Sequence, residues 1–122
     1  MYIEYNPNPC GKKVGDCVIR GISKVLDQTW KQTYSDISYQ GYLMCDMPSS
    51  NAVWAAYLNQ KGFSKKSIDY ITVEGFCEKH PKGTYLLATG THVIPVIDGN
   101  YYDVFNSGME VIDYYFEREF YL

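Results

Sequence analysis

Three side chains in this sequence are of the types that carry out acyl transfer, and they lie far apart along the chain. Cys17 follows the dipeptide Gly-Asp, directly ahead of a hydrophobic pattern with helical spacing. A cysteine in the first turn of a helix faces free backbone N–H groups and the positive end of the helix dipole, which favour the thiolate. The same N–H groups can stabilise an oxyanion. Cys17 is therefore a candidate nucleophile, while a small cysteine packed beneath the helix would satisfy the same pattern.

A thiol nucleophile needs a general base, and the sequence contains two histidines. His80 precedes Pro81 in the polar segment CEKHPKG, which predicts a surface position. His92 begins the apolar segment HVIPVI, which predicts a strand inside a sheet, where an imidazole can meet the end of a helix. We expect His92 to be the base, with a hydrogen-bonded structural histidine as the alternative interpretation.

The second ring nitrogen of the base needs an acceptor, and the turn at Asp98 and Gly99 predicts which residue supplies it. Asp-Gly between two strand-like segments favours a two-residue type I′ hairpin turn. Since side chains alternate between the two faces of a strand, Asp103 then shares the face of His92. A three-residue turn or a bulge would bring Asn106 to that face instead. Asp103 and Asn106 are the two candidates, and we prefer Asp103.

The nucleophile requires a helix that begins at residue 17, and the hydrophobic spacing predicts one over residues 17–26, with Asp16 as its N-cap. Further helices are expected from Thr29 to about Gly41, over residues 50–62 and over residues 72–80. The first thirteen residues contain two Asn-Pro pairs and are expected to be irregular. The basic segment KGFSKK is expected to be a solvated turn.

The histidine and its acceptor require neighbouring strands, and the last third of the chain is rich in β-branched and aromatic residues. Strands are expected over residues 84–89, 91–97, 100–105 and 110–116, separated by the turn signals TGT, DGN and NSG. The predicted fold class is α+β: a single domain of residues 1–122, with N-terminal helices packed on one face of a C-terminal antiparallel β-sheet.

Composition argues against several other classes of protein. The formal net charge of -3 is unlike the basic surface of a nucleic-acid-binding protein. No apolar segment approaches the roughly 18 residues that span a bilayer, and no export signal is visible, so we expect no membrane partner and a cytoplasmic location. The four cysteines lack C-x-x-C spacing, and the histidines are not at ligand spacing. Reduced thiols and no metal or other cofactor are therefore expected.

The order and placement of these residues resemble the papain-like cysteine peptidases. They resemble more closely a group of short bacterial and phage-encoded papain-like proteins, which are similar to the bacteriocin-leader peptidases. The matching segments are GDCVIRGIS, TWKQTYSDI and GTYLLATGTHVIPVIDGNYYDVFNSG. The resemblance implies that Cys17 is the nucleophile, that His92 is the general base and acid, and that Asp103 orients it. The implied substrate is an amide in a peptide or protein.

The sequence also departs from the papain-like pattern. These peptidases often carry a glutamine shortly before the nucleophile, which completes the oxyanion hole. Gly11 stands at that position here, and Asn8 or Asn6 is the candidate substitute. The chain is much shorter than papain, so the second lobe of the cleft is expected to be reduced. Competing functions are therefore an acyl transferase on the same site, a binding module without turnover, and a domain in which Cys17 and His92 are unrelated core residues.

Overall fold

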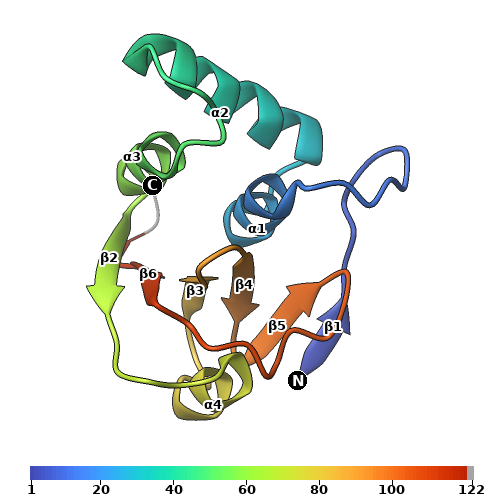
Figure 1. Ribbon diagram of the computed structural model, residues 1–122, viewed down its shortest axis with the longest axis vertical. Coiled ribbons are helices and arrows are strands. Elements are labelled where there is room, and N and C mark those ends of the chain that lie inside the picture. Colours follow the sequence, from blue (N-terminus) through green and yellow to red (C-terminus); the bar gives the residue numbers. More distant parts are fainter. Residues whose placement is uncertain (121–122) are drawn as a thin grey trace.

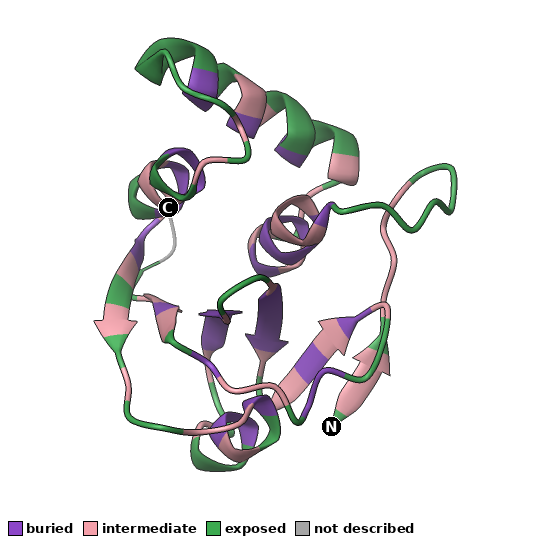
Figure 2. Cartoon of the chain, in the orientation of Figure 1, coloured by how far each residue is buried: buried purple, intermediate pink, exposed green. Residues whose placement is uncertain are grey.

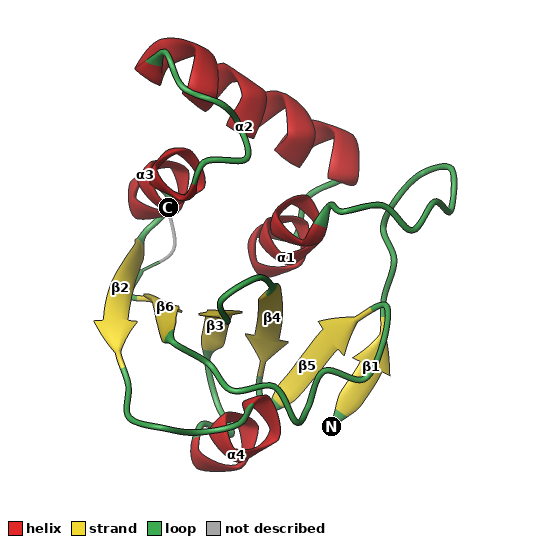
Figure 3. Cartoon of the chain, in the orientation of Figure 1, coloured by secondary structure: helices red, strands yellow, loops and turns green. Residues whose placement is uncertain are grey.

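The computed structural model describes residues 1–120, which form four helices and one six-stranded sheet (Figures 1 and 3). The helices are α1 (Cys17–Leu26), α2 (Trp30–Met44), α3 (Asn51–Gln60) and α4 (Val73–Lys79). The strands are β1 (Tyr2–Glu4), β2 (Phe63–Ser67), β3 (Thr84–Ala88), β4 (Val93–Ile97), β5 (Asn100–Asp103) and β6 (Tyr114–Arg118). They lie in the order β1-β5-β4-β3-β6-β2. The α+β class is as predicted. Within residues 1–120, no helix has the length and apolar character needed to cross a bilayer.

The helix that begins at Cys17 has the predicted bounds and lies close against the sheet. Ile22 and Val25 on its apolar face are buried in the core. A Cβ added to Gly21 would lie 2.8 Å from Leu86 Cδ1, so the glycine allows α1 to approach β3 closely. This close packing places α1 directly against β3 and β4.

The remaining helices begin where their capping residues predict. Thr29 accepts a hydrogen bond from the Gln32 N–H at 3.1 Å at the start of α2, and Thr72 caps α4 in the same way. α2 is longer than expected and continues to Met44, where Cys45 ends it in a left-handed conformation with a φ of 54°.

The helices cover both faces of the sheet, so the prediction that they pack on one face is wrong. α1, α2 and α3 lie on one side and α4 on the other (Figure 1). Leu86 of β3 packs with Ile22 and Trp54 on the first side, whereas its neighbour Leu87 packs with Phe76 of α4 on the second. All five residues of β3 are buried, as Figure 2 shows, which is typical of a strand covered on both faces.

The sheet is mixed, because the N-terminal residues that were expected to be irregular form a strand. β1 runs parallel to β5 along its outer edge, with Ile3 paired to Tyr102. Beyond the strand, the Tyr5 N–H donates to the Asp103 carbonyl at 2.8 Å. The outer edge of β5 would otherwise present unpaired backbone groups, which β1 satisfies. The prediction of a purely antiparallel sheet is therefore wrong.

The C-terminal strand also pairs differently from a simple meander. β6 lies next to β3, and β2 adds to the far edge of β6. Residues 63–66 of the segment KGFSKK therefore belong to an edge strand and not to a turn, with Phe63 buried and Lys65 exposed, as is common at sheet edges. Residues 110–113 were expected to belong to the last strand. They lie before β6 and form an isolated bridge, between Val111 and Thr72, with backbone hydrogen bonds to the segment before α4 and to β3.

The hairpin between β4 and β5 has the predicted turn. Asp98 and Gly99 have φ angles of 50° and 78°, the positive values that a type I′ turn requires. The pairing of the two strands extends only as far as Val96 with Tyr101. Pro95 comes next, and it has no N–H to donate to β5. Beyond that point β5 diverges from β4 (Figure 1), which leaves backbone N–H groups of β4 available for other partners.

The close approach of Gly62, the predicted end of α3, to Phe120 can be tested by mutation. The φ of Gly62 is 91°, and an added Cβ would lie 2.2 Å from the Phe120 carbonyl oxygen. Gly62→Ala is therefore expected to lower the free energy of unfolding by about 2 kcal/mol or more, as measured by urea denaturation. At Gly90 an added Cβ would meet its nearest atom at 3.9 Å, so Gly90→Ala is the control. Equal losses in the two variants would contradict the packing described.

Candidate active site

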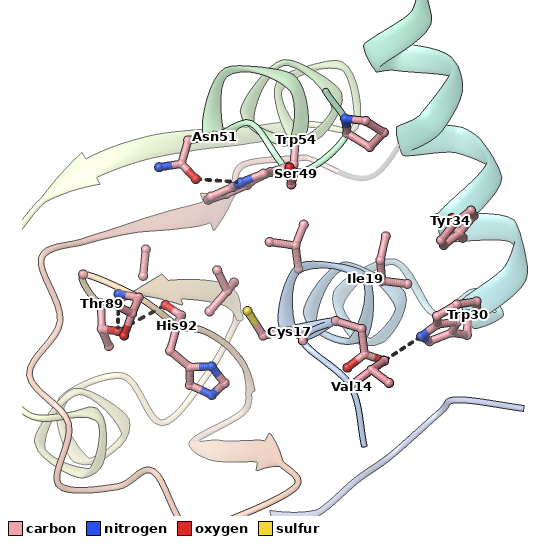
Figure 4. Close-up of a pocket in the computed structure, with 18 of the residues that line it drawn as sticks. Val14, Cys17, Ile19, Trp30, Tyr34, Ser49, Asn51, Trp54, Thr89 and His92 are labelled. Carbon is pink, nitrogen blue, oxygen red and sulfur yellow. Dashed lines mark hydrogen bonds between the residues drawn. The ribbon is translucent and has the colours of Figure 1, made fainter. Parts of the chain in front are cut away.

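Cys17 and His92 are in contact at the N-terminus of α1. Cys17 is the first residue of the helix, and its side chain makes a hydrogen bond with His92, which directly precedes β4. Figure 4 shows the Cys17 and His92 side chains next to each other at one side of the pocket. The Val93 backbone N–H also hydrogen-bonds to the sulfur. This N–H is available because β4 and β5 separate before they reach Val93.

Asp103 holds the other side of the imidazole. His92 Nε2 lies 2.7 Å from Asp103 Oδ2, which leaves Nδ1 as the ring nitrogen that faces Cys17. The Asp103 carboxylate is 1% exposed and accepts two further short bonds, from Ser107 Oγ at 2.7 Å and from the Val104 N–H at 2.8 Å. A carboxylate on Nε2 fixes both the tautomer and the orientation of the ring.

Asn106, the alternative acceptor, lies away from the imidazole. Its Oδ1 accepts hydrogen bonds from the Tyr101 hydroxyl at 2.7 Å and from the Gly108 N–H at 3.0 Å, and the residue is exposed. Because the turn has two residues and not three, Asn106 does not reach the face of His92, and its assignment as the orienting residue is wrong. Phe105 does reach that face, and its ring stacks on His92 with the centroids 5.2 Å apart.

The electrostatics of the three side chains favour a thiolate–imidazolium pair. Burial raises the pKa of the Cys17 thiol, but hydrogen bonds from His92 and Val93, together with the positive charges of His92 and Arg20, lower it below its ordinary value. Burial lowers the pKa of His92, but its hydrogen bonds to Asp103 and Cys17 and their negative charges raise it to about 9. Burial raises the pKa of Asp103, and its hydrogen bonds to His92 and Ser107 outweigh burial and lower it.

A buried arginine joins this group to the start of the helix. Asp16 occupies the predicted N-cap position, yet its side chain makes no cap bond within the described chain. It accepts instead from Arg20 Nη1 and from Trp30 Nε1, the latter at 2.8 Å. Arg20 Nη2 reaches Asp103 Oδ1 at 3.3 Å. From the sequence alone, Arg20, one turn after Cys17, fits either a brace for an acidic partner or a solvated helix position, and the structure shows the first of these.

The backbone N–H groups in the first turn of α1 are the groups that can stabilise an oxyanion next to Cys17. Asp16 gives no side-chain bond to the first-turn N–H groups of α1, so its side chain does not compete with another acceptor for them. Asn6 and Asn8, the candidate donors from the sequence, stabilise their own loop instead: Asn6 Nδ2 donates to the Lys12 carbonyl at 3.2 Å, and Asn8 Oδ1 accepts from the Cys10 N–H at 2.9 Å. Neither asparagine is among the described residues that line the pocket.

Cys17 and His92 open into a pocket of about 560 Å³. Trp30 and Tyr34 of α2 form one wall, with their rings stacked 5.2 Å apart, and Trp54 of α3 lies opposite (Figure 4). Most of the other described lining residues are small or apolar, and the full set of these further residues is Val14, Gly15, Asp16, Val18, Ile19, Ser38, Pro48, Ser49, Asn51, Ala88, Thr89, Gly90, Thr91, Val93 and Tyr114. The Asp16 carboxylate is already bound by Arg20 and Trp30. The pocket therefore presents a largely uncharged, aromatic surface beside the thiol.

The other titratable residues of similar type lie outside this group. All four cysteines are free thiols, and Cys77 is buried, which raises its pKa to about 11. Cys10 and Cys45 are exposed. The His80 ring stacks on Phe76, and its Nδ1 lies 3.0 Å from the carbonyl of that residue. Residues 1–120 contain no group of three or more His, Cys, Asp or Glu side chains arranged to hold a metal ion.

Comparison of the chain with family models, with curated proteins and with solved structures gave no match. Any statement about function therefore depends on the site alone. That site combines a polarised thiol, a carboxylate-oriented imidazole and free helix N–H groups beside an apolar pocket, which is a complete set of groups for attack on a carbonyl.

Proposed function

We propose that the protein is a papain-like thiol hydrolase that cleaves an amide bond in a peptide or protein. The observation that carries the proposal is the continuous hydrogen-bonded chain from Cys17 through His92 to Asp103 at the N-terminus of α1. The helix–strand placement of these residues supports the papain-like arrangement. A nucleophilic thiol must stay reduced, so the proposed location is the cytoplasm.

The reaction proceeds in two halves. The Cys17 thiolate attacks the amide carbonyl, forming a C–S bond and an oxyanion that the first-turn N–H groups of α1 stabilise. The C–N bond then breaks, and the leaving amine takes the proton of the His92 imidazolium. In the second half, neutral His92 removes a proton from water, which attacks the thioester. The acid is released, and the thiolate and imidazolium are restored. An amine in place of water would make the protein an acyl transferase.

The lining of the pocket supports an apolar group next to the scissile amide. Trp30, Tyr34 and Trp54 offer stacking and apolar contact, while the Asp16 carboxylate is already occupied by Arg20. A charged substrate side chain would lose its hydration there without gaining a partner. The substrates that fit best therefore carry an aromatic or branched aliphatic side chain at this position.

A panel of fluorogenic peptide amides tests the proposal. The members differ only at the residue before the scissile bond, which is phenylalanine, leucine, lysine or glutamate. Cleavage of the phenylalanine and leucine members is expected, together with a Cys17 acyl adduct in the intact-protein mass spectrum, and both should vanish in Cys17→Ala. If no member is cleaved and no adduct forms on active esters, although the protein is folded, the hydrolase proposal is wrong and a binding module is the better interpretation.

A further inference from the structure

Arg20 is an almost fully buried cation that contacts two carboxylates. Its side chain is 6% exposed, and those of Asp16 and Asp103 are 6% and 1% exposed. Nη1 donates to Asp16 Oδ1, and Nη2 donates to Asp103 Oδ1 at 3.3 Å. The planar guanidinium can hold two acceptors at a fixed angle, which an ammonium group cannot do.

Each carboxylate uses one oxygen for Arg20 and the other for the site. Asp103 Oδ2 accepts from His92, while its Oδ1 accepts from Arg20 at 3.3 Å and from the Val104 N–H at 2.8 Å, so the arginine contributes to the orientation of the carboxylate. Asp16 presents Oδ2 to Trp30 at the pocket wall and directly precedes Cys17. One side chain thus connects the start of the nucleophile helix with the strand that orients the base.

The charges of the group point the same way. With the ion pair formed, the site holds three negative groups, which are Asp16, Asp103 and the Cys17 thiolate. Without Arg20, the imidazolium of His92 would be the one cation facing them among the described contacts of the site. Repulsion between buried like charges would then favour protonation of the thiolate or of a carboxylate.

We propose that Arg20 is a positioning residue for acyl transfer at Cys17, holding α1 against Asp103 so that the thiolate and the imidazolium stay in contact. The inference rests on the proposed function of Cys17. Arg20 does not touch the substrate in this role, and its influence reaches the reacting sulfur through the two carboxylates and through its charge.

The test compares Arg20→Met with Arg118→Met. Arg118 is also partly buried and donates to the Val25 carbonyl at 3.1 Å, at the other end of α1. Alkylation of Cys17 by iodoacetamide is followed against pH, and stability is followed by urea denaturation. Arg20→Met is expected to shift the titration of Cys17 upward by about one pH unit and to slow labelling near pH 6 by about threefold, because the thiolate of higher pKa is the stronger nucleophile. Arg118→Met should lose stability with an unchanged titration.

The outcomes separate this inference from the proposed function. A wild-type titration in folded Arg20→Met overturns the role of Arg20 and leaves the nucleophile intact. An ordinary thiol titration in the wild-type protein overturns the proposed function first. If Arg20→Met does not fold, Arg20→Lys decides, because lysine keeps the charge but cannot bridge both carboxylates. An upward shift of the Cys17 titration in Arg20→Lys, relative to the wild-type protein, supports the inference. A Cys17 titration that is unchanged from wild type overturns it.

Discussion

Replacement of His92 by alanine is expected to slow alkylation of Cys17 near pH 6 by roughly ten- to a hundredfold. The imidazole supplies both a hydrogen bond and a positive charge to the sulfur, and without them the burial of Cys17 raises the pKa of the thiol. An ordinary thiol, with a pKa near 8.5, is only about 0.3% ionised at pH 6. The full ratio of thiolate fractions is not expected in the rate, because a thiolate of low pKa is also a weaker nucleophile.

His80→Ala is the matched control for this experiment. His80 bonds to the Phe76 carbonyl on α4, on the opposite side of the sheet from α1, so its loss should leave Cys17 labelling unchanged. The exposed thiols of Cys10 and Cys45 provide internal references within each digest. Equal slowing in both histidine variants would mean that the effect is general destabilisation, and the proposed ion pair would be wrong.

Replacement of Asp103 by alanine is expected to have the largest effect on stability, lowering the free energy of unfolding by about 3–5 kcal/mol. The change leaves buried Arg20 and His92 without a shared acceptor. The pKa of Asp103 is lower in the folded protein than the ordinary value of 3.8. The ionised carboxylate therefore stabilises the fold fully at pH values above 3.8. That contribution disappears as the pH falls through the folded pKa. The difference between wild type and variant in urea denaturation should therefore shrink in acid.

Two further variants separate the roles of the carboxylate. Asp103→Asn keeps an acceptor for His92 but removes the charge, so Cys17 labelling should fall between wild type and Asp103→Ala. Asn106→Ala removes the alternative candidate, whose partners are Tyr101 and Gly108, and should not change Cys17 labelling. Slow labelling in Asn106→Ala with normal labelling in Asp103→Ala would reverse the assignment made from the geometry.

The parts of the site that were predicted from sequence depend on local rules. Helical spacing and a capping position placed Cys17 in the first turn of α1, because both signals lie within ten residues of it. The Asp98-Gly99 turn set the alternation of side chains in the hairpin, and that alternation predicted Asp103 and not Asn106 beside His92. The juxtaposition of helix and strands was expected from the resemblance, and the structure brings the three residues together.

The parts that were missed depend on contacts between distant segments. β1 and β5 are separated by nearly the whole chain, and β1 forms because β5 has a free edge, which no local pattern of residues 1–13 reveals. The sequence of β2 is typical of a solvated turn because it contains two lysines and two serines, and Phe63 is its one buried residue. The position of α4 on the second face of the sheet likewise depends on the whole topology.

Within the site, the missed groups are those whose role depends on the local geometry of other elements. Ser107 lies in an NSG segment that is typical of a turn, yet its hydroxyl donates to Asp103 at 2.7 Å. The Val93 N–H is free for the sulfur only because Pro95 ends the β4–β5 ladder, a signal that was present in the sequence. The spacing of Arg20 and Asp16 on one helix indicates that they can pair. The contact of Arg20 with Asp103, which is distant in the sequence, could be seen only in the folded structure.

The most direct measurement is the rate of Cys17 alkylation in the wild-type protein across the pH range, followed by mass spectrometry of each cysteine peptide. Cys17 is expected to stay reactive at pH values well below the ordinary thiol pKa of about 8.5, ahead of Cys10 and Cys45. A second rise is expected as the pH passes about 9, where His92 loses its proton and frees the thiolate. A single titration near 8.5 with no lead over the other exposed thiols would contradict the ion pair and the hydrolase built on it.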